Sequence, residues 1–147
     1  MNIVLKLMAI LFLVLIYSCT EKQSQKETTA NNTQKPQMKF TLNNDQKWQM
    51  DAHTRNSLKN IDSILIAKDQ LTSTEDYKTL GNEINNELLS LIQDCTMEGP
   101  AHDQLHVFLG YFYPLVQDLK NENSVELYNK TLIDIKNLLS EYHKYFD

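Results

Sequence analysis

The apolar residues between positions 77 and 95 recur at spacings that alternate between four and three. They are Tyr77, Gly81, Ile84, Leu88, Leu91 and Cys95. This spacing places the side chains on one face of an α-helix, which must bury that face against other elements. Comparable stripes run within residues 48–68, 100–119 and 124–146. The sequence therefore predicts an all-α fold in which four amphipathic helices share one core.

Turn signals separate the four predicted helices. Hydroxyl side chains at 72–74 come before two acidic residues, which is typical of a helix start. The Gly-Pro pair at 99–100 suits the end of the second helix and the first turn of the third, in which Pro114 predicts a kink. A capping box at 123–126 predicts the start of the fourth. Because the connections are short, we expect an antiparallel up-down-up-down four-helix bundle over residues 46–147.

The start of the chain resembles the signal peptide of a bacterial lipoprotein. An apolar run at 7–16 follows Lys6 and is shorter than the roughly 20 apolar residues that a membrane-spanning helix needs. The segment LIYSC at 15–19 resembles a lipobox, which implies removal of residues 1–18 and acylation of Cys19. An ordinary signal peptide and an uncleaved anchor are the alternatives. The acyl chains would attach the protein to an envelope membrane.

Residues 19–45 are polar and contain few large apolar side chains, which predicts a flexible tether between the lipid anchor and the bundle. Thr20 stands where lipoproteins retained in the inner membrane often carry Asp, so we expect the outer membrane, with the bundle facing the periplasm. The net charge is −5, and the basic residues are scattered singly. This pattern argues against nucleic acid as a partner, because phosphate binding needs a clustered basic surface.

The segment CTMEGPAHDQLH at 95–106 concentrates side chains that can bind a metal ion. His102 and His106 are four residues apart, so their imidazoles share one helical face at a separation that a metal ion can bridge. In an up-down-up-down bundle, the start of the first helix and the end of the fourth lie at the same end as this segment. We therefore expect one shared metal site there. Its predicted ligands are Asp51, Cys95, Met97, His102, His106 and His143.

This donor set favours Zn or Cu. Imidazole with thiolate suits Zn, and the thioether of Met97 shifts the preference toward Cu(I). If Cys19 carries lipid, Cys95 has no second thiol with which to form an internal disulfide. The sequence contains no HExxH motif and no Gly-rich oxyanion loop, so catalysis is not favoured. One alternative is a non-catalytic structural or interaction bundle whose polar corner is an internal hydrogen-bonded network.

The other alternative is a haem protein. The ending EYHKYF at 141–146 is similar to the C-terminal helix of b-type four-helix cytochromes, in which a late histidine ligates haem opposite an early methionine. That similarity implies haem held between His143 and Met50. The sequence has no CxxCH motif for covalent attachment of haem.

Four segments together resemble a family of small Bacteroidetes-type envelope lipoproteins. They are LNNDQKWQMD at 42–51, DYKTLG at 76–81, CTMEGPAHDQLH at 95–106 and YHKYF at 142–146. Members share a Trp-containing first helix, a C-T-M-x-G-x-x-H-x-x-L-H segment and a Tyr-His ending. The resemblance implies a common helical fold and a common site but no particular activity. The matching site positions are Trp48, Asp51, Cys95, Met97, His102, His106 and His143.

Overall fold

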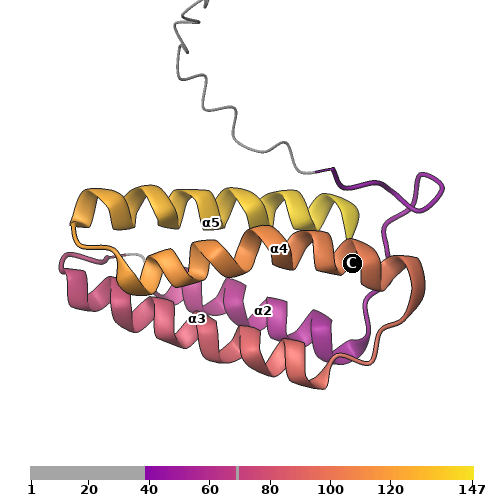
Figure 1. Cartoon of the computed structure of the whole chain (residues 1–147), viewed down its shortest axis with the longest axis horizontal. Coiled ribbons are helices and arrows are strands. Elements are labelled where there is room, and N and C mark those ends of the chain that lie inside the picture. The colour runs from indigo at the N-terminus through magenta and orange to yellow at the C-terminus, as the bar shows by residue number, and fades with distance from the viewer. Residues whose placement is uncertain (1–38, 69) are drawn as a thin grey trace, which may run out of the picture. The chain divides into compact units, whose positions relative to one another are not determined.

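The structure, a computed structural model, describes residues 39–68 and 70–147. The predicted signal peptide, Cys19 and most of the predicted tether lie outside these residues. The helices are α2 (Ala52–Ala67), α3 (Thr74–Asp94), α4 (Gly99–Asn121) and α5 (Val125–Tyr145). Successive helices run in opposite directions (Figure 1), so the predicted all-α four-helix bundle is confirmed. None of the described helices is both long enough and apolar enough to cross a membrane.

Short polar residues cap the starts of α3 and α5. Ser73 accepts a hydrogen bond from the backbone N–H of Asp76 (3.2 Å), and the Asp76 carboxylate accepts one from the N–H of Ser73 (2.9 Å). Backbone hydrogen bonds from Thr72 and Ser73 lower the pKa of Asp76 below its ordinary value. The predicted start of α3 is thus confirmed. The cap of α5 is Ser124, which accepts from the N–H of Leu127 (3.3 Å) and lies one residue after the predicted cap.

The first helix of the bundle starts at Ala52, later than the apolar stripe beginning at Trp48 predicts. Residues 39–51, here named the N-terminal strap, run instead across the end of the bundle. The backbone N–H of Trp48 donates to the carbonyl of Tyr145 (2.7 Å), and the N–H of Asp147 donates to the carbonyl of Trp48 (3.2 Å). The pairing joins backbone groups of residues that are far apart in the chain. It therefore produces no periodic pattern of apolar side chains from which it could be predicted.

The strap extends the packed domain into the predicted tether. Phe40 is buried, and its ring contacts those of Tyr145 (centroids 5.3 Å apart) and Phe146 (5.8 Å). The indole N–H of Trp48 donates to the carbonyl of Thr41 (2.5 Å), which closes the strap on itself. Among the described residues, the packed domain therefore already includes Phe40, which lies before the predicted boundary at residue 46.

Close packing brings α3 and the last turn of α4 together at Gly81. A Cβ atom on Gly81 would lie 3.0 Å from the carbonyl oxygen of Leu119 and 2.9 Å from Cγ of Lys120, so the short distance between the helices requires glycine there. The helix α4 continues through Pro114 to Asn121. Each helix packs closely on its neighbour in the chain. The largest fully buried side chains come from all four helices and from Phe146, the residue after α5. They are Tyr128, Phe108, Phe112, Phe146, Leu58, Ile61, Leu80, Ile84, Leu88, Leu91, Leu105 and Leu119.

Candidate functional site

Asp51 ties the start of α2 to the connection between α3 and α4. Its Oδ1 accepts a hydrogen bond from the backbone N–H of Thr54 (2.7 Å), which makes Asp51 the N-cap of α2. Its Oδ2 accepts from both the N–H (2.9 Å) and the hydroxyl (2.8 Å) of Thr96. Burial raises the pKa of Asp51, but the hydrogen bonds from Thr54 and Thr96 outweigh it and hold that pKa well below its ordinary value. The carboxylate therefore has protein partners at both oxygens.

The two sulfur side chains of the predicted site lie against the core. Cys95 is the C-cap of α3, is half-buried and carries a free thiol. Its Sγ accepts a hydrogen bond from the hydroxyl of Thr54 at 3.8 Å. Met97 is also half-buried and packs against the core. Core packing and the α2 contact thus account for the surroundings of both sulfur atoms.

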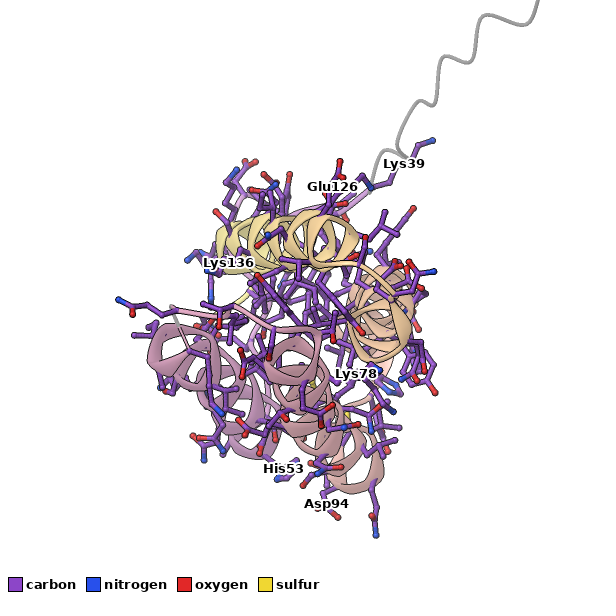
Figure 2. All side chains as sticks on the ribbon, turned by 90° about the vertical axis from the view of Figure 1, so that its left-hand side faces the viewer. Lys39, His53, Lys78, Asp94, Glu126 and Lys136 are labelled. Carbon is purple, nitrogen blue, oxygen red and sulfur yellow. The ribbon has the colours of Figure 1, made fainter. Side chains whose placement is uncertain are left out.

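Two of the four histidines connect helices. Nε2 of His53 lies 3.1 Å from the carbonyl of Ser90 and 3.8 Å from Oδ2 of Asp94. The labelled side chains of His53 and Asp94 lie together in Figure 2. Nε2 of His143 lies 2.9 Å from Oδ2 of Asp62, which links α5 to α2. Each of these two imidazoles thus contacts a residue on a neighbouring helix.

His102 and His106 are arranged differently. Their ring centroids are 4.4 Å apart, and the ring planes are tilted by 56°. His102 is half-buried and His106 is exposed, whereas an inward orientation was expected for both. The buried face of α4 begins at Leu105. Within residues 39–68 and 70–147, each of the two rings has the other as its interaction partner.

The structure thus divides the predicted ligand set among separate places. His102 and His106 are in contact on α4, Asp51 and Cys95 are bonded to threonines, and His143 is bonded to Asp62. Across the described residues, no group of three or more His, Cys, Asp or Glu side chains could hold a metal ion. The described side chains of the predicted ligands therefore do not form one shared site.

An axial offset between helices explains the separate position of His143. Its partner Asp62 lies ten residues beyond Ala52, which is about 15 Å along α2 at roughly 1.5 Å per residue. The last turn of α5 therefore lies beside the middle of α2. Helical periodicity fixes which face a residue occupies but not how far one helix slides along another.

Sequence reasoning missed the partners that occupy the polar side chains. Thr96 and Asp62 are exposed or half-exposed polar residues with no spacing signal of their own. Ile66 and Ile133, by contrast, are large apolar residues that fall outside the core stripes, and both are exposed in the structure. That mismatch between apolar character and stripe position can be read from the sequence.

The pair His102–His106 places two imidazoles four residues apart on one helix, with their ring centroids 4.4 Å apart. The imidazoles lie in the first turns of α4, before its buried face begins at Leu105 or just after it. Neutral imidazoles four residues apart can donate to the same ion, and the remaining coordination positions stay open to water.

Comparisons of the chain with family models, with curated proteins and with solved structures found no match. The fold defines a helical-bundle protein, and functional inference depends on its own side chains. In the haem alternative, Met50 and His143 would be the two ligands. Met50 is packed in the core, with 4% of its surface exposed, and His143 is already bonded to Asp62.

Proposed function

We propose that this protein is a lipid-anchored envelope protein that binds a transition metal ion through His102 and His106 and serves in metal handling. The observation that supports this most directly is the contrast among the four histidines. His53 and His143 are bonded to groups on other helices, whereas His102 and His106 contact each other, with centroids 4.4 Å apart.

The chemistry of the pair suits Zn²⁺ or Cu²⁺. Imidazole nitrogen is a preferred donor for both ions, and affinity for such sites rises toward Cu²⁺ in the divalent series. Two protein ligands leave positions for water or for a donor from another molecule. Because His106 is exposed, an ion held there is accessible for transfer. A site of this kind favours handling or sensing of the metal over its permanent storage.

The predicted anchor sets where this would happen. Acylation at Cys19 would hold the chain on the outer membrane, and residues 20–39 would separate the packed domain from the lipid. For a flexible chain of that length, the end-to-end distance is about 25 Å. The bundle would then face the periplasm, where it could exchange ions with other envelope proteins.

Calorimetric titration of residues 20–147 with Zn²⁺ and Cu²⁺ tests the proposal. We expect one ion per chain, and His102→Gln or His106→Gln should weaken binding by roughly tenfold or more, since one imidazole then remains. The matched controls are His53→Gln and His143→Gln, which should bind as the unmodified chain does. Full binding by the double variant H102Q/H106Q, or equal loss in the controls, would refute the proposal.

A non-catalytic structural or interaction bundle is the second candidate, and the three hydrogen bonds that Asp51 accepts from Thr54 and Thr96 favour it. In this case the polar corner serves to hold α2, α3 and α4 together. The same titration separates the two functions, because a purely structural role predicts that no ion binds. The melting temperature should then be the same with and without added metal. A Soret band after addition of haem would instead support the cytochrome-like alternative.

A further inference from the structure

The bundle is open along one side. Close packing joins α2 to α3, α3 to α4 and α4 to α5, whereas α2 and α5, the first and last of these helices, are separated by a groove of about 540 Å³. The groove is lined by Asp62, Leu65, Ile66, Lys136, Leu139, Ser140 and His143. The bond between His143 and Asp62 links its two walls. A four-helix bundle that closed on itself would fill this space by packing its first helix on its last.

Apolar side chains line the groove and lie beside it. Leu65 and Leu139 are buried and form part of its lining. Ile66 on the α2 wall is 77% exposed, and Ile133, one helical turn before Lys136 on α5, is 59% exposed. Large apolar side chains grouped around a groove, with polar residues at its rim, are typical of a protein-binding surface.

The charges on the groove walls indicate the character of the partner. Lys136 on α5 has no carboxylate partner among the described residues. The same holds for Lys59, which lies one turn before Asp62 on the same face of α2. The carboxylate of Asp62 is itself already bonded to His143. The lining thus includes exposed Ile66 on α2 and the unpaired Lys136 on α5, while Lys59 and Ile133 lie outside the lining, one turn further along the same two helices.

We propose that the groove between α2 and α5 binds an acidic amphipathic helix of a partner protein. Apolar residues of that helix, at spacings of three and four, would pack on Leu65, Ile66 and Leu139. Its carboxylates would face Lys59 and Lys136. A second copy of this chain is disfavoured as the occupant, because its own α2 and α5 would bring the same lysines to the interface. The proposal does not depend on metal binding by α4.

Site-specific photocrosslinking of the full chain, in cells that produce it, tests this surface. A benzoylphenylalanine side chain replaces Ile66 in one variant and Ile133 in another. The control position is Lys78 on α3, which Figure 2 shows away from Lys136. Both groove probes should give the same adduct, and the control should not. Mass spectrometry of the adduct should locate the crosslink on a helical segment of the partner with an apolar stripe flanked by Asp or Glu.

Charge reversal makes the test specific. In the Ile66 probe background, Lys136→Glu should lower the adduct yield about fivefold, since an attractive pair becomes repulsive. The matched variant Lys78→Glu should leave the yield unchanged. Four results would overturn the proposal: no adduct from either groove probe, an equal adduct from the control position, an adduct that joins two copies of this chain, or a yield insensitive to Lys136→Glu.

Discussion

Replacing Asp51 tests the hydrogen bonds that join the start of α2 to the connection between α3 and α4. The Asp51 carboxylate caps α2 through Thr54 and holds the connection between α3 and α4 through Thr96. Asp51→Ala removes both functions. Asp51→Asn keeps a side chain that caps a helix as well as aspartate does, but it removes the negative charge. The two variants together separate the cap from the contact with Thr96.

The expected magnitudes follow from the individual hydrogen bonds. Loss of an N-cap costs about 1 kcal/mol, and the two charge-assisted bonds from exposed Thr96 contribute about 1.5 kcal/mol together. Asp51→Ala should therefore lower the free energy of unfolding by about 2.5 kcal/mol, which corresponds to a fall of roughly 10–15 °C in Tm for a domain of this size. Asp51→Asn should cost about 1 kcal/mol, because the cap remains.

The pH dependence of these effects has a definite sign. The hydrogen bonds of Asp51 place its folded-state pKa below its unfolded value. Such a carboxyl stabilises the fold fully at pH values above the unfolded pKa of about 3.9, and this stabilisation is lost as the pH falls through the folded-state pKa. The difference between the unmodified chain and Asp51→Asn should thus be constant from about pH 5 to 8 and shrink below about pH 4.

Urea unfolding of residues 20–147, followed by far-ultraviolet circular dichroism, measures these differences. Thr96→Val removes the hydroxyl bond and keeps the backbone N–H bond, so its double-mutant cycle with Asp51→Ala should give a coupling energy of about 0.5–1 kcal/mol. A cost of less than about 0.5 kcal/mol for Asp51→Ala would contradict these roles of Asp51. So would a stability difference between the unmodified chain and Asp51→Asn that widens as the pH falls.

Two pairs of matched substitutions test the packing. Gly81→Ala should destabilise the fold by about 1–3 kcal/mol, because its Cβ meets the backbone of Leu119 at 3.0 Å. Gly110→Ala, in open space within α4, should stabilise it by about 0.5–1 kcal/mol; equal effects in urea unfolding would contradict the close contact at Gly81. Tyr77→Phe should cost about 1 kcal/mol, since it loses the 2.6 Å hydrogen bond from its hydroxyl to Asn129. The ring of Tyr128 stacks on that of Tyr77, but its buried hydroxyl has no hydrogen-bond partner in the described part of the chain. Tyr128→Phe should therefore be neutral or stabilising. A loss of stability equal to that of Tyr77→Phe would contradict this difference between the two hydroxyls.

The helices could be predicted from the sequence because their signals are local. The stripe from Tyr77 to Leu91 lies on the buried face of α3, and the hydroxyl and acidic residues at its start form the capping box. The strap could not be predicted in this way. Phe40 and Trp48 are held by the C-terminal residues, about a hundred positions away in the chain, and neither contact produces a periodic pattern.

The candidate site shows the same division. The contact between His102 and His106 follows from their spacing of four residues on one helix. The positions of His143 and Asp51 depend on the axial offset between α5 and α2 and on the hydrogen bonds from Thr96. These are tertiary features, which a pattern within one helix does not encode. The prediction that helix ends lie together holds for the start of α2 and the connection between α3 and α4, which Asp51 and Thr96 join. Among the described residues, the predicted ligands do not converge on one site.

X-ray absorption at the zinc edge, on residues 20–147 loaded with one equivalent of Zn²⁺, tests metal binding by the histidine pair most directly. The account predicts two imidazole nitrogen scatterers at about 2.0 Å, with the other positions filled by oxygen. These imidazole signals should vanish in the double variant H102Q/H106Q. A sulfur scatterer at about 2.3 Å would instead place Cys95 in the site. That result, or a spectrum with no imidazole signal, would contradict binding by His102 and His106 alone.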